Sequence, residues 1–361
     1  MQTTAAVARD ADGPFSLETI DIGPIQPDEV LVKIRAVGLC HSDLVLKSRS
    51  SAPTVFGHEG AGVIVETGAE VGGISVGDSV LLSFAHCGAC PQCTSGHPAY
   101  CAEFVTRNMG GTRPDGSTYL SAAGEPIVGS FFGQSSFAGL ALAKAHDVIP
   151  VPAGTDLTLA APLGCGLQTG AGVVVNVLAP GPDSSLVVFG VGGVGIAAVM
   201  AAAALGVETI VAVDLNGRRR EVARTVGATH AIDGAAGDVA EQIRDITGGG
   251  NSHTFDTTGV PGVIETALAA LGKLGTLVVV GATQGDVTIN YSDLVGSGKA
   301  IRGCIEGDAV PRTFIPRLLD WHAQGRFPIE KIVTTYPFED INTAVADSIS
   351  GQAIKPVLVL N

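Results

Sequence analysis

Four cysteines lie within fifteen residues of one another, at Cys87, Cys90, Cys93 and Cys101. Four thiolates at this spacing form a closed tetrahedral zinc site, in which the protein fills every coordination position. A metal held in this way stabilises the fold and leaves no position for water or substrate. The sequence therefore predicts a structural zinc ion, and we interpret the neighbouring His86 and His97 as solvent-facing residues outside the site.

Three further metal-binding side chains, Cys40, His58 and Cys165, are dispersed along the chain, and their spacing alone does not join them. Two thiolates and one imidazole make a zinc site whose fourth position is open, which catalysis requires. The remaining Cys304 is interpreted as a small core residue. Because the N-terminus lacks the basic flank and apolar run of a secretory signal, we expect a cytoplasmic location, where seven cysteines would not form a disulfide framework.

A glycine-rich turn follows the apolar segment 185–189 and opens a helical stretch. Residues 190–195 read Gly-Val-Gly-Gly-Val-Gly, the G-x-G-x-x-G pattern of dinucleotide-binding folds in its required context. The first glycine permits a tight turn, the second lets the backbone approach a pyrophosphate, and the third allows helix and strand to touch. We therefore expect a coenzyme to be bound by Gly190, Gly192, Gly193, Val194 and Gly195.

An acidic residue, Asp214, ends the next apolar segment, 210–213, and lies 19 residues beyond Gly195. An acid at this place hydrogen-bonds the adenosine ribose and repels a 2′-phosphate, which favours NAD over NADP. Arg218 and Arg219 follow closely, so some use of NADP stays open, and we expect Arg219 to contact the coenzyme.

The elements that must position these residues fall into two groups. Residues 1 to about 150 hold short alternating segments, such as 30–35 and 62–66, divided by turn residues, which is typical of an all-β, barrel-like unit. From about 160 to 300, apolar strands alternate with helical stretches, which predicts buried parallel strands at 185–189, 210–213, 228–232, 253–256 and 276–280. After residue 303 the pattern is mixed, and we expect the strand-like segment 356–360 to rejoin the first unit.

Length and composition agree with a two-domain globular enzyme. The 361 residues are 46% apolar and 16% charged, and every apolar run is soon broken, so we expect no membrane association. The net charge is −14 and no basic stripe appears beyond Arg218-Arg219-Arg220, which excludes nucleic acid as an expected partner.

At these residues the chain resembles the zinc-containing medium-chain alcohol dehydrogenases, from about residue 20 to its end. Residues 38–43 match the family's Gly-x-Cys-[His/Arg]-[Ser/Thr]-Asp element, residues 57–59 its Gly-His-Glu element, and residues 87–101 its four-cysteine lobe. The resemblance implies a GroES-like β-barrel catalytic domain over residues 1–166 and 303–361. It also implies a Rossmann-fold coenzyme domain with a doubly wound parallel sheet over residues 167–302.

The resemblance further implies roles for individual residues. Cys40, His58 and Cys165 would bind catalytic zinc, Glu59 would be an acid able to exchange onto the metal, Asp43 would orient the histidine, and Ser42 would take the proton of the substrate. His41 and Lys355 would face the coenzyme pyrophosphate, and Thr169 would contact the nicotinamide. Many members place a histidine three residues after the serine as the next proton carrier, whereas this chain has Val45, so the proton path stays open.

The apolar Val45, the segment 82–84 and the stretch from residue 305 onward resemble the aryl and benzyl alcohol dehydrogenase branch. This implies reversible oxidation of primary aromatic or allylic alcohols to aldehydes, with Ser83 and Phe84 providing space and an apolar wall. Aliphatic or terpenoid alcohols, or thiol-dependent formaldehyde oxidation, stay open as alternatives, as does a non-catalytic NAD-binding zinc protein. The resemblance also implies a homodimer or homotetramer, with residues 276–280 and 288–291 extending a sheet between subunits.

Overall fold

The computed structural model describes residues 1–281 and 285–360, and contacts between residues divide them into two compact units. The first unit comprises residues 1–165, 310–319 and 333–361, and the second comprises residues 166–309 and 320–332. Residues 303–309 and 320–332 thus group with the second unit, whereas the prediction from the sequence assigned all of 303–361 to the first domain. The functional domain assignment 1–166 and 303–361 against 167–302 stays a prediction.

The first unit is built on two sheets. A five-stranded sheet has the order β4-β1-β2-β7-β8. Its strands are β1 (Gln2–Ala8), β2 (Phe15–Ile22), β4 (Thr54–Val55), β7 (Leu120–Ala122) and β8 (Glu125–Ile127). A seven-stranded sheet has the order β10-β6-β5-β3-β18-β17, and β9 also pairs with β3. Its strands are β3 (Glu29–Gly38), β5 (Gly60–Thr67), β6 (Ser79–Leu82), β9 (Leu140–Lys144), β10 (Val148–Pro150), β17 (Val333–Pro337) and β18 (Lys355–Val359).

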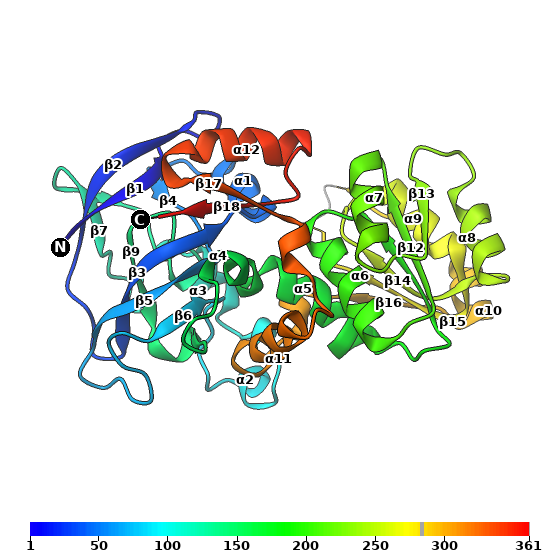
Figure 1. Cartoon of the computed structure of the whole chain (residues 1–361), viewed down its shortest axis with the longest axis horizontal. Coiled ribbons are helices and arrows are strands. Elements are labelled where there is room, and N and C mark those ends of the chain that lie inside the picture. Colours follow the sequence, from blue (N-terminus) through cyan, green and yellow to red (C-terminus); the bar gives the residue numbers. More distant parts are fainter. Residues whose placement is uncertain (282–284, 361) are drawn as a thin grey trace. The chain divides into compact units, whose positions relative to one another are not determined.

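Strand β3 is central to this unit because it pairs with β5, β9 and β18. Eight of its ten residues are buried, which fits a strand covered on both faces. The antiparallel pairing of β18 with β3 confirms that the C-terminal strand rejoins the first unit (Figure 1). The helices of this unit are α1 (His41–Lys47), α2 (Pro91–Thr94), α3 (Phe104–Met109), α4 (Leu157–Ala160) and α12 (Ile341–Ser350). Helix α11 (Pro311–Ala323) crosses the boundary along the chain.

The second unit contains one parallel sheet with the order β13-β12-β11-β14-β15-β16. Its strands are β11 (Ser185–Phe189), β12 (Thr209–Asp214), β13 (His230–Asp233), β14 (Asn251–Asp256), β15 (Leu271–Val279) and β16 (Ala300–Gly303). Counted along the chain this is the order 3-2-1-4-5-6 of a doubly wound dinucleotide-binding sheet. The predicted fold class is therefore confirmed. The five predicted strands are present, the first over the predicted residues and the other four with shifted ends.

Helices connect the strands of this sheet, and α6 and α7 lie in front of it in Figure 1. The helices are α5 (Gly166–Gly172), which continues into a π-helical segment (Val173–Leu178), α6 (Gly193–Leu205), α7 (Gly217–Thr225), α8 (Val239–Thr247), α9 (Pro261–Ala270) and α10 (Tyr291–Ser297). Single helical turns occur at Pro98–Tyr100, Phe131–Gly133, Ala145–Asp147, Ala161–Gly164, Glu306–Asp308, Ile329–Lys331 and Phe338–Asp340.

The prediction that residues 276–280 and 288–291 lie at the edge of this sheet is wrong. Strand β15, which includes most of residues 276–280, pairs on one side with β14 and on the other with β16. Residues 285–290 form no strand, and Tyr291 begins α10. The sequence did not predict β16, whose four residues are all exposed and give no buried apolar run. The two edge strands of the sheet are therefore β16 and, on the opposite side, β13.

Among the described residues, no single helix is long and apolar enough to cross a bilayer. Only the bent pair of residues 157–164 and 166–178 reaches that length and composition when taken together.

Candidate active site

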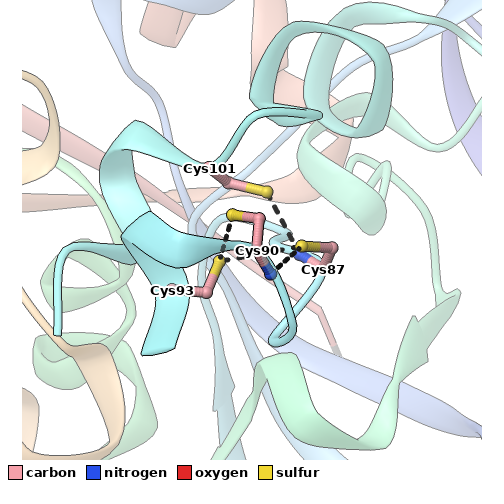
Figure 2. A group of neighbouring side chains, drawn as sticks. All are labelled: Cys87, Cys90, Cys93 and Cys101. Carbon is pink, nitrogen blue, oxygen red and sulfur yellow. Dashed lines mark hydrogen bonds between the residues drawn. The ribbon is translucent and has the colours of Figure 1, made fainter. Parts of the chain in front are cut away.

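The four cysteines of the predicted structural site meet in one loop region around α2, with their sulfur atoms turned toward one another (Figure 2). The sulfur of Cys93 lies 3.5 Å from that of Cys90 and 3.9 Å from that of Cys87. A tetrahedral site with zinc–sulfur bonds of about 2.3 Å has sulfur atoms about 3.8 Å apart. The spacing of these thiols therefore fits a zinc ion.

Backbone N–H groups point at these sulfur atoms and favour the thiolate form that zinc binds. Cys87 Sγ accepts from the amides of Ala89 and Cys90, and Cys90 Sγ accepts from the amide of Ala102. The Ala102 N–H lowers the pKa of Cys90 to about 6, whereas burial raises the pKa of Cys93 to about 12. Adjacent thiols cannot all ionise without a cation among them, and zinc supplies that positive charge.

The three dispersed ligands also come together, all within the first unit. Cys40 immediately precedes α1, His58 lies between β4 and β5, and Cys165 follows the helical turn Ala161–Gly164. One ligand atom from each lies within 4.8 Å of those of the other two. The structure thus places in one cluster three residues that sequence spacing could not join, and their zinc-binding role fits this geometry.

Asp43 is the central acceptor of this cluster and is fully buried. Its Oδ1 lies 2.8 Å from His58 Nδ1 and accepts the amide of Gly57, while Oδ2 accepts the amide of Cys40 at 2.9 Å. One carboxylate therefore orients two metal-binding residues. An imidazole that donates from Nδ1 to a carboxylate presents Nε2 to a metal.

His58 Nε2 itself is the strongest sign that the cluster holds a cation. It is buried, and among the described residues it has no hydrogen-bond partner. Burial opposes the charged imidazolium, but Asp43 and Cys40 together raise the pKa of His58 well above its usual value. The hydrogen bond from Cys165 lowers the pKa of Cys40, which favours a thiolate. A zinc ion would satisfy the nitrogen and both sulfur atoms.

Glu59 forms a buried ion pair beside the cluster. Both of its carboxylate oxygens lie 2.6 Å from Lys355 Nζ, which also donates to the carbonyl of Leu39. Burial raises the pKa of Glu59 to about 7 in spite of the nearby ammonium group. A Cβ at Gly38 would lie 1.9 Å from Glu59 Oε2, so only glycine leaves room for the carboxylate there.

Two phenylalanines that the sequence did not single out pack on the imidazole of His58. The ring of Phe132 stacks on it at 4.4 Å between centroids, and the ring of Phe131 meets it edge-on at 5.3 Å. Phe132 has a φ of 49°, a left-handed conformation that is unfavourable for a side chain of this size. The surrounding structure must therefore hold the helical turn Phe131–Gly133 in this conformation. Through its two aromatic rings, this turn fixes the imidazole of His58.

Gln134 and Ser83 support the same cluster through backbone groups. Gln134 Nε2 donates to the carbonyl of His58, and its Oε1 accepts the amide of Gly60. Ser83 is buried and donates 2.7 Å to the carbonyl of Gly164, next to Cys165. The Ser83 hydroxyl therefore holds the backbone next to the metal-binding residue Cys165. The expectation that Ser83 provides space near a substrate stays a prediction.

Ser42, the predicted proton carrier, and His41, a predicted coenzyme contact, lie in α1, and Lys355, the other predicted coenzyme contact of this unit, begins β18. Ser42 is half-buried, with its Oγ 3.8 Å from Cys40 Sγ, and His41 is exposed. Val45 follows on the same helix and has no proton to exchange. The contacts of His41 and Lys355 with a coenzyme stay predictions, as does the role of Ser42.

In the second unit, the glycine turn has the conformation that its sequence predicts. Gly190 has a φ of 81°, and a Cβ on Gly195 would lie 2.0 Å from the Gly190 carbonyl oxygen. The nearest atom to a Cβ on Gly192 would be a guanidinium nitrogen of Arg219, 4.0 Å away, so this face of the turn is open for a ligand. Gly193 and Val194 form the first turn of α6. The turn therefore fits a pyrophosphate at a helix N-terminus.

Asp214 and Arg219 lie beside this turn. Asp214 ends β12, and its carboxylate accepts the amides of Val191 and Asn216, each at 2.8 Å. Arg219 Nε is buried and has no hydrogen-bond partner among the described residues. Thr169 is buried in α5, with its Oγ1 3.4 Å from Glu306 Oε2. Contacts of these three side chains with NAD remain predictions.

Zinc undergoes no redox change, so an enzyme that oxidises a substrate at zinc also needs an electron acceptor. The parallel sheet and glycine turn provide the fold that binds such an acceptor, a dinucleotide. The class that these features define is a zinc-dependent dehydrogenase.

Comparisons with known proteins agree. The family model of the alcohol dehydrogenase GroES-like domain matches residues 26–153, and that of the zinc-binding dehydrogenase domain matches residues 193–324. The geraniol dehydrogenase of Castellaniella defragrans is 44% identical, and the match covers 98% of this chain and 97% of that protein. The chain belongs to the zinc-containing medium-chain alcohol dehydrogenase family, which confirms the resemblance seen in its sequence.

Two solved structures are similar over the whole chain. An alcohol dehydrogenase zinc-binding domain protein from Burkholderia ambifaria is 47% identical with a TM-score of 0.98, covering 100% of this chain and 99% of its own. The benzyl alcohol dehydrogenase of Acinetobacter calcoaceticus is 40% identical with a TM-score of 0.97, covering 100% of both chains. The chain is an alcohol dehydrogenase, its metal is zinc, and NAD is the coenzyme typical of its family.

Proposed function

We propose that this enzyme oxidises primary alcohols whose carbinol carbon is attached to an sp² carbon, either aromatic or allylic, and transfers the hydride to NAD. Similarity to both a geraniol dehydrogenase and a benzyl alcohol dehydrogenase carries the proposal. Geraniol is allylic and benzyl alcohol is aromatic, so the feature their names share is an unsaturated carbon next to the reacting one. The aromatic rings of Phe131 and Phe132 beside His58 are consistent with such a substrate.

Cys40, His58 and Cys165 would hold the catalytic zinc, and Cys87, Cys90, Cys93 and Cys101 the structural zinc. When bound, the catalytic ion supplies Lewis acidity at its open position, and NAD supplies the hydride acceptor. The chain's own part is to hold the ligands in place. Asp43 orients His58 and the backbone of Cys40, while Phe132 and Phe131 fix the imidazole plane and exclude water from its faces.

We further propose that the hydroxyl of Ser42 takes the proton from the substrate. The proton must then leave by a route other than the side chain three residues later, because Val45 cannot carry it. A coenzyme hydroxyl or a water molecule would be the next acceptor. Glu59 stands close to the ligands, and its pairing with Lys355 would keep it off the metal in this arrangement.

The coenzyme preference rests on Asp214, whose carboxylate sits at the end of β12 beside the glycine turn. A carboxylate here would accept hydrogen bonds from the adenosine ribose and repel a 2′-phosphate. Arg219 would lie against the coenzyme at the same turn. NAD would accordingly be preferred over NADP.

A substrate panel tests the proposal. Initial rates of NADH production would be measured with benzyl alcohol, geraniol, hexanol and a hydroxymethyl thiol, and zinc would be quantified per chain. We expect kcat/KM for benzyl alcohol and geraniol to exceed that for hexanol by about tenfold or more, the range that shape discrimination in an apolar pocket gives. Equal or greater turnover of hexanol would favour an aliphatic alcohol dehydrogenase, and preference for the thiol adduct would favour formaldehyde oxidation.

The Cys40→Ser variant provides the control for this panel. It should lose turnover with every alcohol and retain NADH binding, measured by quenching or enhancement of coenzyme fluorescence. A variant that still oxidises alcohols would contradict the role of Cys40. No production of NADH by the wild-type protein with any alcohol would instead favour a non-catalytic zinc protein.

We also propose a cytoplasmic homo-oligomer, a dimer or a tetramer. The four exposed residues of β16 give the sheet of the second unit an edge with free pairing positions. Sedimentation would test this, and a monomer at micromolar concentration would contradict it.

A further inference from the structure

A third group of metal-binding side chains lies where the cysteine lobe begins. His86 directly precedes Cys87, and His146 and Asp147 belong to the helical turn Ala145–Asp147 between β9 and β10. His86 Nδ1 lies 2.7 Å from Asp147 Oδ1, and His146 Nε2 lies 3.3 Å from the same oxygen. One ligand atom from each residue lies within 4.8 Å of the other two. The expectation that His86 only faces solvent is therefore wrong.

The carboxylate of Asp147 carries an unsatisfied oxygen. Asp147 is 7% exposed, and its Oδ1 accepts the amide of His86 at 3.3 Å. Its Oδ2 is buried and has no hydrogen-bond partner in the part of the chain that the structure describes. A buried carboxylate oxygen without a donor is costly, and a cation bound by the carboxylate would offset that cost. The two imidazoles lie against the other oxygen, Oδ1, so the carboxylate can bind a cation beside both rings.

The backbone around this group is held in place independently of any ligand. Arg312 donates from Nε to the carbonyl of His146 at 3.1 Å and from Nη2 to that of Ala145 at 2.6 Å. The rings of His86 and His146 meet edge-on, 5.0 Å apart between centroids. The ligand atoms are therefore presented by a fixed backbone and face one another.

We propose that His86, His146 and Asp147 form a third metal site, for zinc or a divalent first-row metal of similar preference. Two imidazoles and one carboxylate suit these ions, whereas magnesium and calcium prefer oxygen ligands alone. In a tetrahedral site with bonds of about 2.0 Å to nitrogen and oxygen, the ligand atoms lie about 3.3 Å apart. The observed separations of 2.7 and 3.3 Å require only a small opening of the group.

Metal binding changes one hydrogen bond. His146 Nε2 now lies 2.7 Å from the carbonyl oxygen of His86. To bind the metal, this ring moves its proton to Nδ1 and turns away from the carbonyl, which an exposed side chain can do. Water fills the fourth position, so the ion exchanges with solution more readily than one held by four thiolates.

The test is a metal count on the whole protein with its two other zinc sites filled. Wild-type protein, His146→Ala and His230→Ala would be dialysed against zinc buffered at rising free concentrations, and bound zinc would be counted per chain. His230 is an exposed histidine of the second unit and controls for adventitious binding to single histidines. We expect wild type and His230→Ala to gain one further equivalent that a mild chelator removes, and His146→Ala to lack it.

Two results would overturn the proposal: no further equivalent in wild type at free zinc up to the solubility limit, or the same further equivalent in His146→Ala. Because His146 is exposed, its replacement should leave folding intact, and circular dichroism would check this. Asp147→Asn provides a second variant, and retention of the equivalent there would also count against the site. The readout is a difference in bound zinc between variants, so it does not depend on which residues form the catalytic site.

Discussion

Replacing Asp43 with asparagine should loosen the catalytic metal more than its small change in shape suggests. The carboxylate of Asp43 accepts from His58 Nδ1, the amide of Gly57 and the amide of Cys40. Asparagine has one acceptor oxygen and one donor nitrogen in the same places. Whichever way the amide is turned, its nitrogen faces at least one of these buried donors.

The magnitude follows from those three contacts. One buried donor left without an acceptor costs about 1–3 kcal/mol, and the hydrogen bonds that remain lose the strengthening that a charged acceptor gives. Replacing residues that orient metal ligands typically lowers metal affinity or activity about 10- to 100-fold. We therefore expect Asp43→Asn to be destabilised by about 2 kcal/mol and to release the catalytic zinc at a 10- to 100-fold lower chelator concentration.

The assay is competition with a coloured chelator, followed by activity at limiting and at excess zinc. Activity of Asp43→Asn should fall at limiting zinc and recover in part when zinc is added. Asp10→Asn, on an exposed side chain of the same unit, is the matched control and should behave as wild type. If Asp43→Asn keeps wild-type zinc retention and thermal stability, the reasoning that Asp43 orients the ligands is refuted.

Three further variants test other parts of the structure. Gly195→Ala places a Cβ 2.0 Å from the Gly190 carbonyl oxygen, so it should lower the free energy of unfolding by about 1–3 kcal/mol and weaken NADH binding. Thermal unfolding and fluorescence titration would measure these effects. Gly72→Ala, where a Cβ meets nothing within 4 Å, should change neither. Asp214→Ser should weaken NAD binding about 10- to 100-fold and relax discrimination against NADP. Asp233→Ser, at the end of the next strand, should do neither. An unchanged coenzyme preference in Asp214→Ser would show that Asp214 does not contact the ribose. Cys90→Ser should lose one zinc ion per chain and unfold at a lower temperature, whereas Cys304→Ala should keep both zinc ions. A stable Cys90→Ser variant that lacks this zinc and is inactive would contradict a purely structural role for the four-cysteine site.

Sequence reasoning predicted best the features that depend only on short, continuous segments of the chain. The segment 185–189 is apolar throughout and ends in the glycine turn, and the structure places β11 over the same residues. The four thiols from Cys87 to Cys101 are likewise close in sequence, so their meeting required no knowledge of the fold. Strand β16 was missed because its exposed residues carry no apolar pattern.

Other features depend on distant contacts that no local pattern encodes. Cys40, His58 and Cys165 could be grouped only through a family resemblance, because three separate elements of the first unit bring them together. The stacking of Phe132 on His58 depends on a left-handed backbone at a residue type that disfavours it, so propensity argues against the turn that creates it. The pairing of His86 with Asp147 likewise joins residues 61 positions apart in the chain.

The most direct test is a crystal structure of the zinc-replete protein, with anomalous scattering recorded on both sides of the zinc absorption edge. We expect an anomalous peak within bonding distance of Cys40 Sγ, His58 Nε2 and Cys165 Sγ, and a second peak among the four lobe cysteines. Absence of the first peak, in crystals that show the second, would contradict the claim that these three residues share one metal ion.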